Sequence, residues 1–286
     1  MADKAGGFTE AQVISRLREI FATSDPRVEV GIGDDAAVVA GTDKRQVMTT
    51  DMAVEGVHFR TDWSSAFEIG RKVTAANAAD VLAMGAKPEY LVVALSLVGD
   101  EGLERVRELA EGIKHEADKT GTRVVGGDIA RASAISIAMT AIGSVERAIT
   151  RSGAQVGDGI YISSLTGWSA AGLAIIEKDL ETDMALHAVS EFCAPTVDYS
   201  AAVQFANGKA TSMCDISDAL VIQAEQIAAA SAVQLVIERD LISKHPEFET
   251  LSELAQSQGI DVWQWILAGG EDHVFLATGK DLDGFR

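Results

Sequence analysis

Acidic residues recur at the ends of short apolar or glycine-rich runs in this sequence. They are Asp34, Asp35, Asp51, Asp80, Asp128, Asp215, Asp218, Glu271 and Asp272. Loops at strand ends can place such carboxylates at one edge of a sheet. Mg²⁺ prefers oxygen ligands and is usually bound by carboxylates together with the phosphates of a substrate. The pattern therefore indicates a hard-cation site that holds a phosphate group.

Each aspartate taken alone also has a simpler interpretation, because aspartate after glycine is common in turns and helix caps. Asp80 is harder to explain in this way, since it lies within an alanine-rich segment expected to be helical. A carboxylate there should be exposed, paired or bound to a metal. Spacing alone does not show that the carboxylates converge, so both interpretations stay open.

Two further residues are candidates of lower specificity. His58 follows a short apolar run, and a lone histidine is more often a surface residue than a catalytic one. Arg151 stands in a loop-like segment and, taken alone, is a solvated arginine. In a nucleotide site the same guanidinium could form bidentate hydrogen bonds with a phosphate.

The composition bounds the class of protein. The 286 residues are 47% hydrophobic and 23% charged, which is typical of a globular chain with a full core. The formal net charge of −19 repels nucleic-acid backbones, so we expect no nucleic-acid partner. An acidic protein that handles a phosphate must recruit cations, and divalent metals would meet that need.

Several familiar motifs are absent from the sequence. There is no GxxxxGK[ST] loop, no HRD and DFG pair, no complete dinucleotide fingerprint and no HExxH or paired-cysteine zinc spacing. The two cysteines, Cys193 and Cys214, are expected to be reduced thiols. Because neither a signal peptide nor an apolar run of membrane-spanning length is evident, we expect a cytoplasmic protein without a membrane partner.

The periodicity of apolar residues predicts a mixture of helices and strands. We expect helices at 9–21, 68–84, 101–120, 169–177, 218–230 and 247–258, and strands at 28–33, 36–40, 46–50, 90–97, 122–126, 134–145, 160–163, 212–216, 233–237 and 274–278. The strands at 36–40 and 46–50 are expected to form a hairpin. The order favours an α+β fold with layered α/β arrangement and two domains, 1–147 and 148–286.

Taken together, the motifs resemble those of the thiamine-monophosphate kinase family. The matching segments are 31–37, 49–52, 56–59, 77–86, 126–128, 150–154, 215–218 and 269–272. The resemblance runs from about residue 8 to residue 278. Jointly the motifs are specific, whereas several are shared with the wider superfamily of ATP-binding aminoimidazole ribonucleotide synthetases and selenophosphate synthetases.

The resemblance implies transfer of the γ-phosphoryl group of ATP to thiamine monophosphate, with several Mg²⁺ ions. It implies Mg²⁺ ligands at Asp35, Thr49, Thr50, Asp51, Asp80, Asp128, Asp215 and Asp218. It implies ATP contacts at Gly127, Asp128, Arg151 and Ser217, and contacts of His58 and Glu271 with the thiamine phosphate. The expected catalytic residues are Asp51, Asp128 and Arg151. The resemblance also implies a homodimer whose N-terminal mixed sheets, covered by helices on one face, pair together, and a C-terminal α/β domain, with the nucleotide between the two.

Two departures from the family pattern leave alternatives open. Ala219 stands where the family usually has glycine, and family members continue beyond the last predicted strand, which indicates a truncated C-terminus. One alternative is another enzyme of the superfamily, although no cysteine precedes Cys193 to match the reactive N-terminal residue of selenophosphate synthetases. The other is a catalytically silent protein that binds a nucleotide and Mg²⁺.

Overall fold

A computed structural model describes residues 10–30, 32, 38–41, 43–99, 101–178, 183–282 and 284–285. The chain folds as two compact units. Unit 1 comprises Met1–Val81 and Ala86–Glu146, and unit 2 comprises Leu82–Gly85 and Arg147–Arg286. Each unit contains both helices and a sheet, which confirms the α+β class expected from the sequence.

Unit 1 is built around a four-stranded sheet in the order β3-β6-β4-β5. Its elements are α1 (Glu10–Ile20), β1 (Val28–Val30), β2 (Val38–Val39), β3 (Arg45–Val54), α2 (Ala66–Ala83), β4 (Lys87–Leu97), α3 (Leu103–Thr120), β5 (Arg123–Arg131) and β6 (Ser136–Val145). β4 and β5 are parallel, whereas β6 is antiparallel to both of its neighbours. β3 and β5 are therefore the two edges of the sheet.

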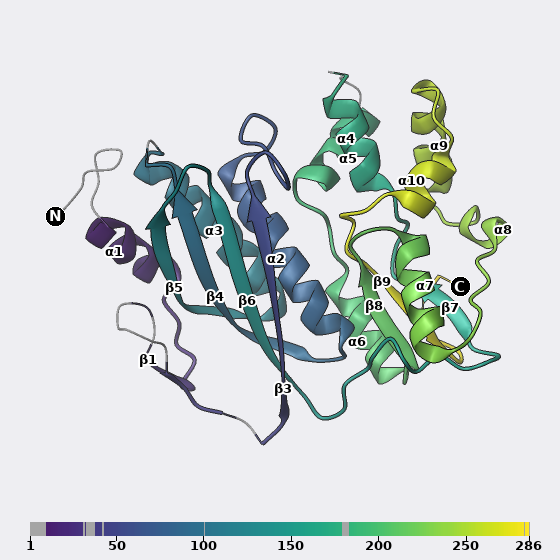
Figure 1. Cartoon of the computed structure of the whole chain (residues 1–286), viewed down its shortest axis with the longest axis horizontal. Coiled ribbons are helices and arrows are strands. Elements are labelled where there is room, and N and C mark those ends of the chain that lie inside the picture. The colour runs from purple at the N-terminus through teal and green to yellow at the C-terminus, as the bar shows by residue number, and fades with distance from the viewer. Residues whose placement is uncertain are drawn as a thin grey trace. The chain divides into compact units, whose positions relative to one another are not determined.

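One face of this sheet is covered by α2 and α3, and no described helix packs on the other (Figure 1). Burial in β3 alternates accordingly, with Thr49 and Ala53 turned inward and Met48 and Met52 turned outward. The outward side chains of Met48 and Met52 are 68% and 59% exposed. This leaves an apolar sheet face that nothing in the described part of the chain buries.

Helices α2 and α3 cross where each carries a glycine. A Cβ on Gly70 would lie 2.3 Å from the carbonyl oxygen of Leu109, and one on Gly112 would lie 2.0 Å from that of Phe67. Side chains at these positions would therefore force the helices apart. The glycines let α2 and α3 approach closely enough to sit side by side on one sheet face.

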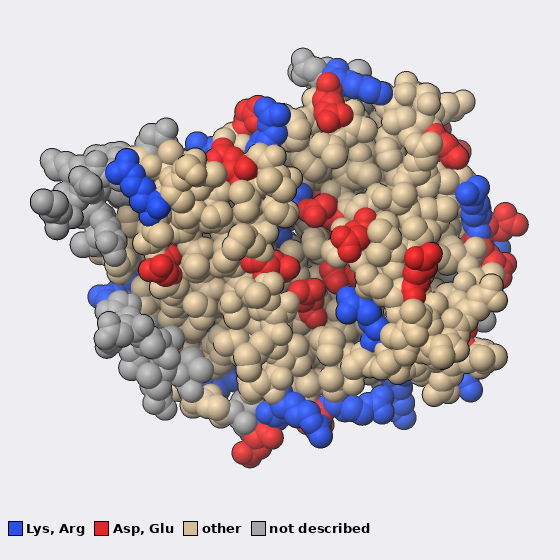
Figure 2. All heavy atoms as spheres, viewed as in Figure 1, with Lys and Arg blue, Asp and Glu red and all other residues tan. Residues whose placement is uncertain are grey.

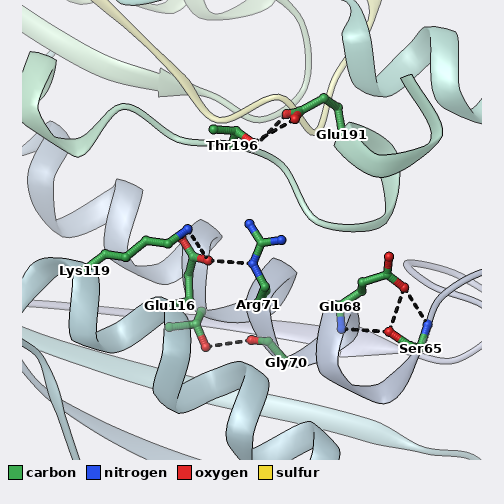
Figure 3. Close-up of polar contacts among 9 residues, drawn as sticks. Ser65, Glu68, Gly70, Arg71, Glu116, Lys119, Glu191 and Thr196 are labelled. Atoms are coloured by element: carbon green, nitrogen blue, oxygen red, sulfur yellow. Dashed lines mark hydrogen bonds and ion pairs between the residues drawn. The ribbon is translucent and has the colours of Figure 1, made fainter. Parts of the chain in front are cut away.

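Polar contacts fix the start of α2 and its seam with α3 (Figure 3). The Ser65 hydroxyl accepts from the Glu68 N–H at 3.2 Å, while the Glu68 carboxylate accepts from the Ser65 N–H at 2.8 Å. This reciprocal pair is a capping box. At the seam, the fully buried Glu116 carboxylate contacts Arg71 Nε at 3.0 Å and Lys119 Nζ at 2.9 Å.

Unit 2 has a smaller antiparallel sheet in the order β7-β9-β8. Its elements are β7 (Gly159–Ile162), α4 (Trp168–Ile176), α5 (Asp183–Cys193), α6 (Tyr199–Asn207), β8 (Ser212–Ile216), α7 (Leu220–Ser231), α8 (Arg239–Ile242), α9 (Phe248–Ser257), α10 (Val262–Ala268) and β9 (Val274–Gly279). One core joins residues of α4, α5, α9 and α10, and a second joins α7 to the sheet. Every residue of the central strand β9 is buried.

The structure corrects several expectations from the sequence. The expectation of a hairpin between 36–40 and 46–50 is wrong. β2 pairs with β1, whereas β3 pairs along ten residues with β6. The longer ladder satisfies more backbone groups than a local hairpin would. The strand expected at 233–237 is also wrong, since these residues have no strand partner in the described chain. The helices α5, α6, α8 and α10 were not predicted.

Figure 2 shows acidic and basic side chains interspersed with larger uncharged areas on the visible face. None of the helices in the described ranges combines the length and apolar composition needed to cross a bilayer.

Candidate active site

In unit 1 the edge strand β3 presents hydroxyl and carboxylate oxygens toward α2. Thr49 Oγ1 donates to Asp80 Oδ2 at 2.6 Å, so the carboxylate within the alanine-rich helix has a partner. Asp51 lies two residues further along β3 and is half-buried like Thr49. Because alternate residues of a strand share a face, Asp51 is on the same side of the sheet as this pair. Three predicted metal-binding residues thus lie on the helix-covered side.

Thr50 is placed differently from its neighbours. Its hydroxyl donates to the Met139 carbonyl at 3.0 Å and accepts from Thr140 Oγ1 at 3.2 Å. It is exposed on the opposite face of β3. The structure therefore does not bring the Thr50 hydroxyl to Thr49, Asp51 and Asp80.

Asp128 lies in β5, at the other edge of the same sheet, opposite Ala94 of β4. Two strands stand between β3 and β5, and neighbouring strands are about 4.8 Å apart, so roughly 14 Å separates the two edges. The structure does not bring Asp128 to Asp51 within this unit. The preceding Gly127 has a packing role, because a Cβ there would lie 2.0 Å from the Val93 carbonyl oxygen.

His58 lies in the turn that follows β3. The Val54 N–H donates to its Nδ1 at 3.1 Å, so in the neutral ring the proton is on Nε2. The ring is exposed, which leaves Nε2 accessible as a donor. Asp34 and Asp35, the latter predicted as a metal ligand, lie outside the described residues.

In unit 2 the end of β8 and the loop before β9 bring four predicted residues together. Asp215 is the last but one residue of the fully buried strand β8, and Ser217 and Asp218 follow directly after the strand ends. The Glu271 N–H donates to the Ser217 carbonyl at 2.7 Å, which ties the second loop to the first. Two segments far apart in the sequence therefore place three carboxylates and a hydroxyl at one end of the sheet.

Gln223 of α7 steadies this group and was missed by the sequence reasoning. Its Oε1 accepts from the Ala219 N–H at 3.0 Å, and its Nε2 donates to Asp218 Oδ2 at 3.3 Å. The available signal was a glutamine five residues after Asp218, within the helix predicted at 218–230. Ala219 has φ of −174°, which is extended backbone that any residue adopts. The departure from the family glycine therefore causes no strain.

His273 is a second residue that the sequence reasoning missed. Its Nδ1 lies 3.0 Å from Asp215 Oδ2, and both side chains are buried. The His273 N–H donates to the Ile216 carbonyl at 3.0 Å. The ring thus orients the Asp215 carboxylate from within the core, and its position directly after two acidic residues was the only signal.

Asp272 anchors the same loop to α4. Its two carboxylate oxygens accept from the N–H groups of Gly167 and Ser169 at 2.8 and 2.9 Å. Burial raises the pKa of Asp272 to about 6, although these two hydrogen bonds oppose the shift. These contacts of Asp272 are with the backbone at the start of a helix. They indicate that Asp272 holds the loop in place and so positions the neighbouring Glu271.

Arg151 lies in a loop fixed to the end of α7. Ser231 Oγ donates to the Arg151 carbonyl at 2.8 Å and accepts from the Ala154 N–H at 3.0 Å. The Arg151 side chain is exposed. Burial raises the pKa of the Cys214 thiol to about 12 and the adjacent Asp215 adds to the rise, while Arg151 opposes it. The guanidinium therefore lies close to the end of β8 that carries Asp215.

The oxygen donors of both groups match the ligand preference of Mg²⁺. Their chemistry fits a hard cation, because the predicted ligands are carboxylates and hydroxyls and include no thiol or imidazole. Within the described ranges, no three histidine, cysteine, aspartate or glutamate side chains already form a metal-binding cluster. Unit 1 therefore contributes oxygen donors around Thr49 and Asp80, and unit 2 contributes oxygen donors at the end of β8.

Comparisons of the sequence and of the structure with known proteins agree on one family. Residues 33–145 match the model of AIR synthase related protein, N-terminal domain. The chain is 38% identical to a thiamine-monophosphate kinase of Corynebacterium glutamicum over 89% of its own length and 79% of the relative. The crystal structure of thiamine-monophosphate kinase from Stenotrophomonas maltophilia K279a is similar, with a TM-score of 0.78, 28% identity and coverage of 95% and 86% of the two chains. AaThiL complexed with AMPPCP and TMP gives a TM-score of 0.74 at 28% identity, covering 95% of this chain and 85% of the other. The chain therefore belongs to the thiamine-monophosphate kinase family.

Proposed function

We propose that this enzyme transfers the γ-phosphoryl group of ATP to thiamine monophosphate and so forms thiamine diphosphate and ADP. The observation that carries the proposal is the grouping of Asp215, Ser217, Asp218 and Glu271 at the end of β8 in a chain of this family. A relative of known structure has been solved with AMPPCP and TMP, a pair that matches a nucleotide donor and a phosphate acceptor.

The proposed roles follow the chemistry of the side chains. Thr49, Asp51 and Asp80 in unit 1, and Asp215 and Asp218 in unit 2, would hold Mg²⁺, with Asp35 and Asp128 as further ligands. The Thr50 side chain lies on the other face of β3, so we do not propose its hydroxyl as a ligand. Mg²⁺ would supply the positive charge that a strongly acidic protein lacks for binding phosphates. Gly127, Asp128, Arg151 and Ser217 are proposed to contact ATP, and His58 and Glu271 to face the thiamine phosphate.

The transfer itself needs little covalent participation from the protein. A phosphate oxygen of thiamine monophosphate forms a bond to the γ-phosphorus, and the bond from that phosphorus to the β-phosphate oxygen breaks. The acceptor oxygen is largely ionised near neutral pH, so no strong general base is required. The protein has to align the two phosphates and reduce their repulsion. Arg151, held by its loop beside β8, is suited to neutralise charge on the transferred group.

We also propose that the active form is a homodimer joined through the uncovered sheet face of unit 1. Met48 and Met52 expose large apolar side chains there, and Ala94 and Thr140 extend the same face with small ones. A second copy of the chain offers a matching apolar surface. A cytoplasmic location remains a prediction from the sequence.

The acceptor is tested by measuring ADP release from ATP and Mg²⁺ with thiamine, thiamine monophosphate and an aminoimidazole ribonucleotide precursor in parallel. Only thiamine monophosphate should support turnover. Turnover with free thiamine instead would refute the assigned acceptor. Binding of ATP without turnover on any acceptor would favour a silent nucleotide-binding protein.

A further inference from the structure

The buried side chain of His273 has no role in the proposed transfer, yet it ends on a residue proposed to hold Mg²⁺. Nδ1 of its ring lies 3.0 Å from Oδ2 of Asp215. Asp215 is 4% exposed and His273 is 6% exposed. Burying a polar side chain is unfavourable unless hydrogen bonds satisfy it, so the contact between the two side chains holds both in place. His273 is therefore placed to act on a cation through Asp215.

The direction of this hydrogen bond follows from the chemistry of the two groups. An ionised carboxylate only accepts hydrogen bonds, so the proton lies on Nδ1 of His273 and the ring donates. The ring engages Oδ2 of Asp215, and Oδ1 is the oxygen that a cation can share without displacing the ring. Carboxylates that bind metals are commonly held by a hydrogen bond of this kind from a neighbouring group.

The backbone of the same loop is tied to the end of β8 at two points. The pairing of β8 with β9 ends at Ile216 (Figure 1). Beyond it, the His273 N–H donates to the Ile216 carbonyl at 3.0 Å. The Glu271 N–H donates to the Ser217 carbonyl at 2.7 Å. The ring therefore reaches the carboxylate from a backbone that the end of β8 itself holds.

Two residues of this loop have a backbone conformation that side chains rarely adopt. φ is 69° at Glu271 and 52° at His273, both in the left-handed region. Such residues persist where the surroundings hold them, and they cluster at functional sites. Gly270 adds a close approach, since a Cβ there would lie 2.4 Å from the Asp218 carbonyl oxygen and 2.5 Å from that of Ser217. The loop therefore holds one position against the end of β8.

We propose that His273 is a positioning residue for Mg²⁺: by donating from Nδ1 to Oδ2 of Asp215, it turns Oδ1 toward the cation and raises the affinity of this carboxylate for the metal. This role rests on the proposed function, because it takes Asp215 as a Mg²⁺ ligand. A free carboxylate loses rotational freedom when it binds a cation, whereas one already held by the ring loses less. The affinity should therefore depend on the donor at position 273 and not on the bulk of the ring.

Three variants at position 273 separate the hydrogen bond from the packing and from the backbone. His273→Asn keeps an N–H donor at the same position along the side chain, and asparagine tolerates the left-handed conformation. His273→Leu keeps much of the bulk without the donor. His273→Gly suits the positive φ without the donor. His115→Leu, which removes an exposed imidazole from α3, is the matched control.

Binding of Mn²⁺ to the full chain with AMPPCP and no acceptor measures the metal site apart from turnover. Mn²⁺ takes the oxygen ligands that Mg²⁺ takes, and electron paramagnetic resonance reports its free concentration. Asp215→Asn identifies the Mn²⁺ ion that Asp215 holds. His273→Leu and His273→Gly should each weaken the binding of that ion by about 10- to 100-fold. His273→Asn and His115→Leu should bind it as the wild type does.

Kinetics with thiamine monophosphate supply a second readout. In His273→Leu, the Mg²⁺ concentration that gives half of the maximal rate should rise by the same factor, while kcat at saturating Mg²⁺ stays near the wild-type value. A purely structural role would instead lower the unfolding free energy in urea and leave the Mg²⁺ requirement unchanged. Adding His273→Leu to Asp215→Asn should weaken Mn²⁺ binding no further, because the two side chains act as one unit.

Folded His273→Leu and His273→Gly that bind Mn²⁺ as tightly as the wild type would overturn the proposal, with circular dichroism as the check of folding. Equal weakening by His273→Asn and His273→Leu would also overturn it, because the donor would then have no effect. A wild type that binds Mn²⁺ with AMPPCP but releases no ADP with thiamine monophosphate would refute the assigned reaction instead. The Mn²⁺ comparison would still decide the role of His273 in that case.

Discussion

Asp51 lies on the helix-covered face of β3, beside the pair formed by Thr49 and Asp80. We expect Asp51→Asn to lower kcat by about two orders of magnitude or more, since it removes a charge that the proposed site needs to hold a cation. The matched control is Asp43→Asn, an exposed aspartate just before the same strand, which should keep near-normal activity. ADP release measures both. Near-normal turnover in Asp51→Asn, with the fold intact by circular dichroism, would contradict the metal-site assignment.

The carboxyl group of Asp272 should make the unfolding free energy fall as the pH rises. Its pKa rises from its ordinary value of 3.8 to about 6 in the folded state, mainly through burial. Below about pH 4 the group is protonated in both states, whereas above about pH 6 the folded state carries an ionised, buried carboxylate. Its contribution to the unfolding free energy is therefore full at low pH and is lost as the pH rises through 6, by roughly 3 kcal/mol.

Urea unfolding of the wild type and of Asp272→Asn at pH 4, 5, 6 and 7 isolates this contribution. Other carboxyl groups titrate alike in both proteins, so the difference between the two curves belongs to Asp272. We expect the wild type to lose stability relative to the variant between pH 4 and pH 6. Parallel curves over this interval would show that the Asp272 carboxyl is not desolvated in the folded protein.

At the scale of single residues, the sequence predicts which side chains could supply oxygen ligands but not how they are arranged. Carboxylates after apolar runs indicated oxygen ligands, and Asp80 indeed has a polar partner in Thr49. The sequence could not show that Thr50 faces away from Thr49, because that depends on the pleat of β3. The pairing of His273 with Asp215 depends on a contact between β8 and the loop before β9, which no local pattern records.

Among the elements, the crossing of α2 and α3 has the least tolerance for change. A methyl group at Gly112 would lie 2.0 Å from the Phe67 carbonyl oxygen, which is backbone and cannot rotate away. We expect Gly112→Ala to lower the unfolding free energy by about 2–3 kcal/mol through overpacking. Gly102→Ala, at the start of α3 with open space around it, should change it by less than about 0.5 kcal/mol. Urea unfolding compares the two, and equal stabilities would mean that the helices can separate at no cost.

The elements that were predicted well are those whose apolar pattern is strong and local. α2, α3, β4 and β6 have long runs that leave few alternative conformations. The errors occur where pairing decides the outcome. Residues 233–237 have the alternation of a strand but no neighbour, and β3 was assigned to a hairpin although its partner is β6, about ninety residues away. Short helices such as α6 are stabilised by tertiary packing and are weakly marked in sequence.

For the whole molecule, the decisive feature is the sheet face of unit 1 that no described helix covers. Met48 and Met52 are 68% and 59% exposed there, an arrangement that a monomer in water would not favour. We expect the wild type to be a dimer by size-exclusion chromatography with light scattering. The double variant Met48→Lys, Met52→Lys should be a monomer, because two opposed faces would each bury unpaired charges. Val57→Lys, which changes a 76% exposed residue in the turn after β3, is the matched control and should remain a dimer. A double variant that stays dimeric at the same concentration would place the subunit contact on another surface.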